Sequence, residues 1–350
     1  MARRRALGVI RFTRAGLPNV STAPDSMRQQ GATRDVTVVI ATYNRSNVLR
    51  FTLEALIRQT LTDWEALVIG DHCTDDSGRV VESFGDPRLK WWNLPTNLGD
   101  QSGPNSVGAR LARGRYIAWL NHDDLWFPDH LERLLDGAQA QSAGFVASGW
   151  LNVGPRPGAT GGGMELVAEQ WNPVSRQRIH MADVYPASTW LVRRDLVSRI
   201  GDWRSFAQLR AAPSQDYVFR CWASGARMRL GGRPSVVAIQ SARFPGAYAD
   251  RRVAEHEHLA PAVARMTPEA LAADLKAELP LSQLPLSERI RVARGGRDLP
   301  FALAREGVMA TAVPLAARLG VGPAEFKARL RGVAPGAWKA ELTALRGIER

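Results

Sequence analysis

The chain is poor in cysteine and has no long apolar run. Cys73 and Cys221 are the two cysteines in its 350 residues, too few for a disulfide framework and without the paired spacing of a zinc site. No stretch approaches the roughly 18 consecutive apolar residues of a membrane-spanning helix. The basic opening MARRRALGVIRFTRAG lacks the apolar core of a secretory signal. These absences favour a soluble protein in a reducing compartment, and we expect it in the cytoplasm.

Motifs of several common enzyme classes are also missing. The sequence has no GxxxxGK[ST] phosphate loop and no GxGxxG after an expected strand, which removes the usual support for an ATPase or a dinucleotide-binding enzyme. It has no GxSxG nucleophile elbow and no HExxH pair. The triplet HEH at His256–His258 has the wrong spacing for two metal ligands on one helix face.

Acidic residues are outnumbered, with 34 Asp and Glu against 46 Lys and Arg, which gives a net charge of +12. Such a balance favours anionic partners, namely a nucleic acid, an acidic membrane surface or a phosphorylated substrate, but a general preference for arginine explains it equally well. No recognisable nucleic-acid-binding module accompanies the charge, so we expect no nucleic-acid partner. The Arg-rich C-terminal segments permit a peripheral contact with a membrane surface.

Composition divides the chain into three regions. Residues 1–34 are basic with little periodicity and predict a flexible arm. Residues 35–248 alternate short apolar runs with amphipathic segments and predict one α/β domain. Residues 249–350 are rich in Ala, Leu, Arg and Glu with Pro and Gly breaks, and predict a helical C-terminal region.

The alternation within the second region predicts a mainly parallel sheet flanked by helices. Strands are expected at 36–44, 64–70, 89–92, 115–120, 144–153, 188–194 and 235–240, and helices at 46–59, 78–84, 103–114, 127–140 and 216–225. Ser46 is expected to cap its helix and Pro128 to lie in a first helical turn. The segment 153–163, VGPRPGATGGG, is expected to be a flexible loop.

Polar clusters follow three of these strands. They are TYN at 42–44, DHCTDD at 71–76 and NHDD at 121–124. Ligands of open α/β sheets bind beyond the carboxyl ends of the strands, so we expect the clusters to converge on one edge. Asp123 and Asp124 can solvate a turn, or they can hold a divalent cation that also binds a diphosphate.

Two further carboxylates have two readings each. Asp71 can cap the next helix, or it can accept a hydrogen bond from a nucleobase. Asp216 begins an expected helix, a place where Asp is commonly structural, or it can serve as a general base if it faces the same cleft.

Four segments together resemble a known family. They are VTVVIATYNRSNVLRFTLEALIRQT, VIGDHCTDDS, ARGRYIAWLNHDDLWFPDHLE, and ASTWLVRRDLV with the later QDYVFRCWASG. In this order, over roughly residues 36–240, the chain resembles a family 2 glycosyltransferase with the GT-A fold, a Rossmann-like sheet flanked by helices.

The resemblance implies a donor site for a nucleotide-diphosphate sugar. Ala41, Thr42 and Tyr43 would line the base pocket, and Asp71 would contact the base. Asn105 is nearest to the position where the family often has an arginine for the diphosphate.

The resemblance also implies a metal site and a catalytic base. Asp123 falls on the metal-binding carboxylate of the DxD motif, with Asp124 beside it, and Mn²⁺ or Mg²⁺ would bridge the diphosphate. Asn121 replaces the first Asp of that motif, and His122 stands between them as a further contact. Asp216 would deprotonate the acceptor hydroxyl, with inversion at the anomeric carbon.

Taken together, these features predict a metal-dependent inverting glycosyltransferase that acts in glycan, cell-surface polysaccharide or glycoconjugate synthesis. The QxxRW element of processive synthases is absent, which favours transfer of a single sugar. Three alternatives stay open: a catalytically silent protein that keeps the fold, a nucleotidyltransferase, and a nucleic-acid binder suggested by charge alone. The nucleotidyltransferase would need a glycine-rich basic loop after the first strand, and ATYNRSN is not one.

Overall fold

The fold comes from a computed structural model of the chain. The structure describes residues 17–28, 34–155, 164–170, 175–176, 185–210, 212–240, 247–277 and 334–336. The predicted arm falls mostly outside these ranges, as do most of the predicted loop at 153–163 and most of the predicted helical region.

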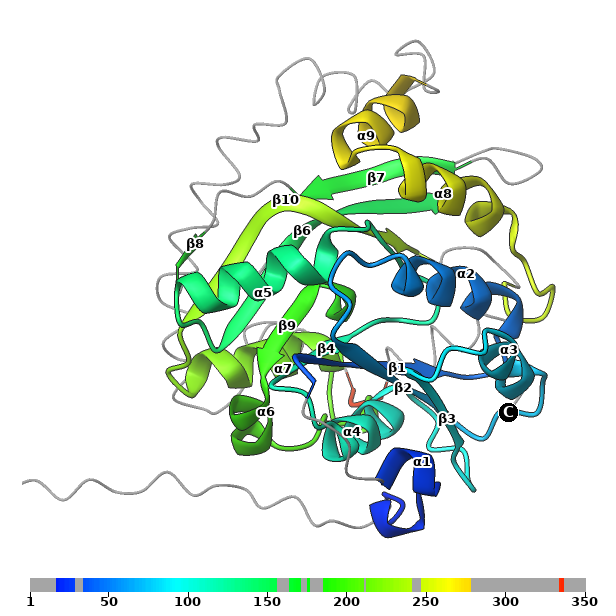
Figure 1. Cartoon of the computed structure of the whole chain (residues 1–350), viewed down its shortest axis with the longest axis vertical. Helices are drawn as coiled ribbons and strands as arrows, with labels where there is room; N and C mark the ends of the chain where they lie inside the picture. Colours follow the sequence, from blue (N-terminus) through cyan, green and yellow to red (C-terminus); the bar gives the residue numbers. More distant parts are fainter. Residues whose placement is uncertain are drawn as a thin grey trace, which may run out of the picture.

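One mixed sheet forms the centre of the molecule (Figure 1). Its order is β3-β2-β1-β4-β9-β6-β10-β5, with β7 beside β6 and β8 beside β10. The strands are β1 (Val36–Thr42), β2 (Trp64–Gly70), β3 (Leu89–Asn93), β4 (Tyr116–Trp119), β5 (Leu125–Trp126), β6 (Phe145–Pro155), β7 (Met164–Gln170), β8 (Ser175–Arg176), β9 (Trp190–Arg193) and β10 (Met228–Ile239).

Most strands run in one direction. β1 to β4, β6 and β10 are aligned with one another, and β5, β7, β8 and β9 run against them. Fully buried Val, Ile, Ala and Trp side chains fill β1, β2 and β4, as expected for strands covered on both faces. The predicted α/β class with a mainly parallel sheet is confirmed.

Helices cover both faces of the sheet (Figure 1). α2, α3 and α5 lie on one face, and α4, α6 and α7 lie on the other. The helices are α1 (Asp25–Arg28), α2 (Ser46–Ile57), α3 (Ser77–Ser83), α4 (Ser102–Leu111), α5 (His130–Ala140), α6 (Arg194–Ile200), α7 (Pro213–Ala223), α8 (Ala254–Arg265) and α9 (Pro268–Ala277), with 3-10 turns η1 (Val20–Thr22) and η2 (Ala187–Thr189).

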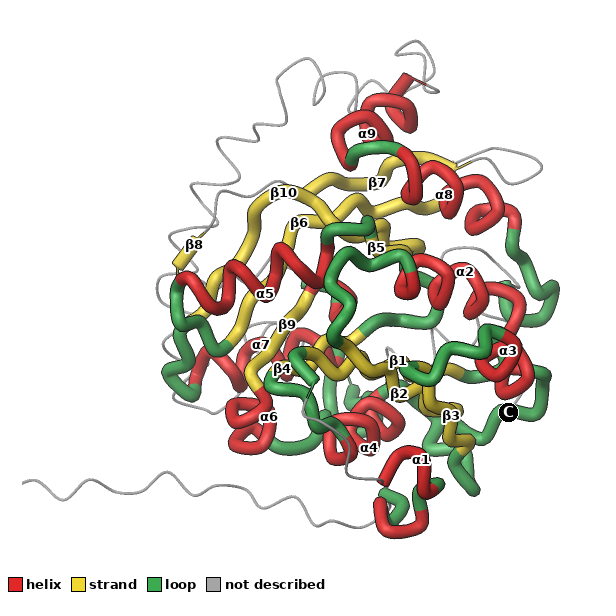
Figure 2. The backbone as a smooth tube through the Cα atoms, in the orientation of Figure 1, coloured by secondary structure: helices red, strands yellow, loops and turns green. Residues whose placement is uncertain are grey.

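The last two described helices join the core of the sheet. Leu259 and Val263 of α8 and Leu271 of α9 share a buried apolar cluster with residues of β5, β6 and β10, and Figure 2 shows both helices beside that end of the sheet. The predicted domain boundary at 249 therefore falls just before helices that pack on the sheet. No helix within the described ranges is long and apolar enough to cross a membrane.

Several local expectations differ from the structure; β10, for example, begins at Met228 rather than at the expected 235, and helix α6 was not expected. Ser46 is the first residue of α2 rather than its cap, and its N–H donates to Asp75 of the next strand-end loop at 3.0 Å. Pro128 precedes α5, whose cap is Asp129. The strand β7 was not expected, because it pairs along the outer side of β6 and its mixed polar sequence has no clear period.

Replacing Gly108 with alanine should destabilise the protein. A Cβ at this position in α4 would collide with Cγ1 of Val39 in β1, which is fully buried. Alanine improves helix propensity by about 1 kcal/mol, whereas overpacking costs about 1–3 kcal/mol. We expect a net loss of up to about 2 kcal/mol in denaturant unfolding. The Gly108→Ala/Val39→Ala double variant should lose less than the sum of its single variants; strict additivity would contradict the close contact.

His130 should make the fold sensitive to acid. Its buried ring stacks on Trp126 at 4.3 Å, and burial together with Arg133 holds its pKa well below the ordinary 6.5. Below pH 6.5 the unfolded chain therefore binds a proton that the folded chain does not. The free energy of unfolding therefore decreases as the pH is lowered, by up to about 1.4 kcal/mol per pH unit. The drop in melting temperature from pH 7.5 to 5.5 should shrink in His130→Phe and persist in the control His258→Gln, at an exposed position.

Candidate active site

The carboxyl ends of β1, β2 and β4 lie side by side at one edge of the sheet. β1 pairs in parallel with β2 on one side and with β4 on the other. The polar clusters 42–44, 71–76 and 121–124 therefore meet at this edge, as the sequence predicts. We call these three segments the strand-end site.

Asp71 is a buried link between two loops of the site. Its N–H donates to the Thr42 carbonyl oxygen at 2.8 Å. Its carboxylate accepts from the backbone N–H groups of Leu98 at 2.7 Å and Gly99 at 3.0 Å. The neighbouring Thr42 Oγ1 is buried and has no hydrogen-bond partner in the described part of the chain. Few buried polar atoms in folded proteins lack a partner, so Thr42 Oγ1 marks this edge as a candidate place for a bound ligand.

The two adjacent carboxylates of the turn between β4 and β5 have different roles. Asp124 is buried; its Oδ1 accepts from the Ile239 N–H at 3.0 Å, and its Oδ2 accepts from Asn121 Nδ2 at 2.8 Å and from the Ser188 hydroxyl. Burial and the neighbouring Asp123 raise the pKa of Asp124 to about 7. Because both oxygens are engaged inside the protein, Asp124 belongs to the frame of the turn rather than to its open side.

Asp123 and His122 lie on the other side of that turn. Both side chains are 13% exposed, and His122 Nε2 lies 4.0 Å from Asp123 Oδ2. His122 Nδ1 lies 3.1 Å from the Ala41 carbonyl oxygen, which joins the turn to β1. A partly exposed carboxylate and an imidazole thus stand together where the resemblance implies a metal ion.

A segment much later in the sequence packs against the strand-end site. We call residues 247–256, which follow β10 and include the first three residues of α8, the strap. Arg45, whose side chain is almost fully buried, donates to the Ala247 carbonyl oxygen at 2.6 Å and stacks on the Tyr248 ring at 4.5 Å. The Tyr248 hydroxyl lies 3.2 Å from His122 Nε2. Further along, His256 Nε2 donates to the Asp123 carbonyl oxygen at 2.9 Å, and burial lowers the pKa of His256 to about 4.

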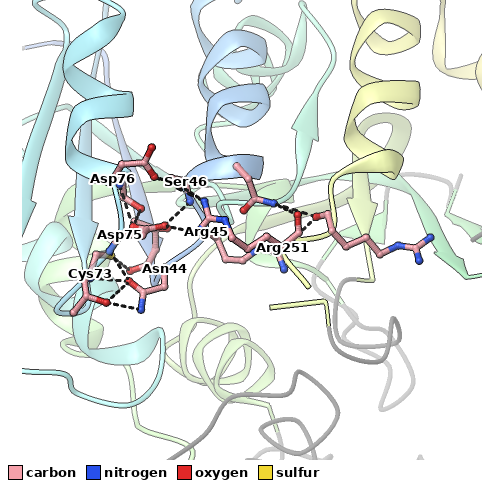
Figure 3. A network of polar contacts seen from close by, with 12 residues as sticks. Asn44, Arg45, Ser46, Cys73, Asp75, Asp76 and Arg251 are labelled. Atoms are coloured by element: carbon pink, nitrogen blue, oxygen red, sulfur yellow. Dashed lines mark hydrogen bonds and ion pairs between the residues drawn. The ribbon is translucent and has the colours of Figure 1, made fainter. Parts of the chain in front are cut away.

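Charged contacts fasten the strap to the other loops (Figure 3). Arg251 lies 3.4 Å from Asp75 and 3.8 Å from Asp76, and it also donates to the Ser46 hydroxyl at 2.5 Å. The strap therefore contacts the ends of all three strands. Sequence reasoning missed it, since the HEH triplet was its one visible signal and that triplet has the wrong spacing for a metal pair.

Asp216, the expected base, lies in the first turn of α7 with its carboxylate buried. Oδ1 accepts from Arg204 Nη1 at 3.0 Å and Oδ2 accepts from Arg220 Nε at 2.8 Å. The adjacent Tyr217 packs its ring 5.4 Å from that of Trp119, the last residue of β4. The start of α7 therefore lies close to the strand that carries the Asp123 turn.

The remaining expected residues are placed less closely together. Ala41 and Tyr43 flank Thr42 at the end of β1, and both are partly exposed. Asn105 is buried within α4. No hydrogen bond joins the Asn105 amide to the strand-end site among the described residues, so its diphosphate role stays a prediction.

A divalent cation fits Asp123 best. Within the described ranges, no three or more His, Cys, Asp or Glu side chains gather to hold a metal by themselves. Cations that act on nucleotides commonly use one or two carboxylates and take their other ligands from phosphate and water. Asp123, whose side chain is partly exposed at the strand end, is a carboxylate of this kind.

Comparison with known proteins gives a consistent result. Residues 37–199 match the family "Glycosyl transferase family 2". The succinoglycan biosynthesis protein ExoO of Rhizobium meliloti is 35% identical over 109 residues, which are 31% of each chain. The UDP-Glc:alpha-D-GlcNAc-diphosphoundecaprenol beta-1,3-glucosyltransferase WfgD of Escherichia coli is 31% identical over 99 residues, or 28% of this chain and 38% of WfgD. The chain thus spans about a third of the length of these curated relatives.

The fold has a counterpart among solved structures. S. aureus TarS, residues 1–349, solved in complex with UDP-GlcNAc, superposes with a TM-score of 0.51 at 16% identity and covers 89% of this chain and 92% of that one. This likeness concerns the fold alone. The sequence match to glycosyl transferase family 2 covers residues 37–199, which run from β1 to α6.

Proposed function

We propose that this chain transfers a sugar from a nucleoside-diphosphate sugar to an acceptor hydroxyl. The observation that carries the proposal is the convergence of three strand ends, where the Asp123 side chain is partly exposed, within the residues that match the family. The relatives named for succinoglycan biosynthesis and for a diphosphoundecaprenol acceptor support a role in cell-surface polysaccharide or glycoconjugate synthesis. A lipid-linked acceptor of that kind would bring the chain to a membrane surface.

The donor would bind along the strand-end site. Thr42 Oγ1 offers an unsatisfied buried polar atom, and Tyr43 a partly exposed ring beside it. The Asp71 carboxylate, held by the backbone N–H groups of Leu98 and Gly99, would accept a hydrogen bond from the base. These three residues form the base side of the proposed site.

The diphosphate would lie at the turn between β4 and β5. Asp123 would hold a Mn²⁺ or Mg²⁺ ion there, and Asp124 would keep the turn in place from inside. When bound, such an ion supplies Lewis-acid stabilisation of the departing nucleoside diphosphate.

The acceptor would approach from the α7 side. Arg204 and Arg220 orient the Asp216 carboxylate, and Arg220 is itself fixed by the carbonyl oxygens of Ile200 and Asp202 at 2.9 and 3.0 Å. The carboxylate keeps further lone pairs with which it can accept the proton of an acceptor hydroxyl. Attack from that side, opposite the leaving group, would invert the anomeric centre.

Nucleotide binding should depend on both metal and Asp123. UDP, GDP, dTDP and CMP are each added with and without Mn²⁺, and the melting temperature is recorded. One nucleotide should stabilise the wild type, by about 2.7 kcal/mol at a hundred times its dissociation constant, and only with metal. Asp123→Ala should abolish that metal-dependent shift, while Asp136→Ala, at an exposed position on α5, should retain it. A shift that ignores both metal and Asp123 would exclude the proposed metal role.

Asp216→Asn should separate catalysis from binding. Loss of a general base lowers turnover about 10²–10⁴-fold, while the thermal shift with the nucleotide should stay as in the wild type. Turnover is followed as nucleoside diphosphate released from the matching sugar donor, with water or GlcNAc-diphosphoundecaprenol as acceptor. Asp202→Asn, which removes an exposed ion pair with Arg110, is the control and should keep its turnover. Full activity in a folded Asp216→Asn would reject Asp216 as the base.

A further inference from the structure

His122 is held in the way that metal-binding histidines are held. Its Nδ1 lies 3.1 Å from the Ala41 carbonyl oxygen, and a carbonyl oxygen can only accept. Nδ1 therefore carries the hydrogen, and in the neutral ring Nε2 is the nitrogen with the free electron pair. A ring N–H donated to a backbone carbonyl is the usual support of a histidine that binds metal through its other nitrogen.

The Nε2 atom of His122 also lies near the carboxylate of Asp123, 4.0 Å from its Oδ2. Around an ion with bonds of about 2.1 Å, neighbouring ligand atoms are roughly 3 Å apart and opposite ones roughly 4 Å apart. Both atoms can therefore bind one ion with little movement of either side chain.

We propose that His122 Nε2 and Asp123 bind the divalent cation together, and that this pair selects a first-row transition ion such as Mn²⁺ over Mg²⁺. The proposal rests on the proposed function, because a nucleoside diphosphate completes the site. Mg²⁺ favours oxygen ligands alone, whereas an imidazole nitrogen strengthens binding along the series from Mn²⁺ to Co²⁺. The histidine in the middle of the acidic motif is thus a determinant of metal preference.

Tyr248 of the strap is a positioning residue for this pair. Because Nε2 accepts, the Tyr248 hydroxyl donates to it, at 3.2 Å, and the two rings also meet edge to face at 6.1 Å. An ion on Nε2 would displace that hydroxyl. The tyrosine therefore orients the ring before the ion arrives and competes weakly with the ion afterwards.

The test is electron spin-echo spectroscopy of the full chain loaded with Mn²⁺, alone and with UDP or GDP. We expect a ¹⁴N coupling from a bound imidazole in the wild type. His122→Asp should still bind Mn²⁺, without the coupling, and its preference for Mn²⁺ over Mg²⁺ in calorimetry should fall roughly tenfold or more. His258→Gln is the control, since His258 is exposed on α8 and lies outside the segments of the strand-end site. It should keep the coupling.

The variant Tyr248→Phe distinguishes a positioning role of Tyr248 from a purely structural one, because the two roles predict different changes in Mn²⁺ affinity. It keeps the ring but removes the competing hydroxyl, so Mn²⁺ should bind about two- to tenfold more tightly. Weaker binding would overturn the role of Tyr248. Mn²⁺ that binds through Asp123 without a ¹⁴N coupling would overturn the role of His122 and leave the proposed function standing. If the nucleotide binds without any metal, the role of His122 is likewise overturned and the proposed function stands. If neither nucleotide nor metal binds, the role of His122 and the proposed function are both overturned.

Discussion

The buried carboxylate of Asp124 is the interaction on which the strand-end site depends. It fastens the turn after β4 to the last residue of β10 and to η2, which are distant in the sequence. Removal of such a group would leave a buried N–H unpaired, at a cost of about 1–3 kcal/mol. Asp124 is turned inward, whereas the side chain of the neighbouring Asp123 stays partly exposed. One carboxylate thus fixes the place from which the other acts.

The strap also holds the turn between β4 and β5, through contacts of Tyr248 and His256. It uses backbone carbonyl oxygens as acceptors for Arg45, so the contact needs no particular side chain at Ala247. The side chains that matter, Tyr248 and His256, meet the turn at His122 and at the Asp123 carbonyl oxygen. The turn is therefore held on both sides, and its partly exposed atoms are left at one place where a ligand can reach them.

Much of this could be predicted from sequence, for identifiable reasons. The runs 36–42 and 64–70 are short, mostly apolar and contain Val and Ile, which is typical of buried parallel strands. Their alternation with helices predicts that their ends share an edge. The difference between Asp123 and Asp124 could not be predicted, because neighbouring identical residues give no sign of which one faces inward. The arginines around Asp216 and the strap contacts depend on pairs far apart in the sequence, for which local periodicity carries no signal.

The strap also bears on the order in which the molecule is completed. Arg45 and Ala247, which meet directly, are separated by 202 positions, so this contact closes one of the longest loops in the described structure. Closing a loop of this length costs more entropy than forming a local contact, and proteins with many such distant contacts fold more slowly. During synthesis, residues 37–199 emerge before the strap does. The sheet can therefore assemble while its ligand-facing edge is still open, and the edge acquires its final shape only after the chain has passed His256.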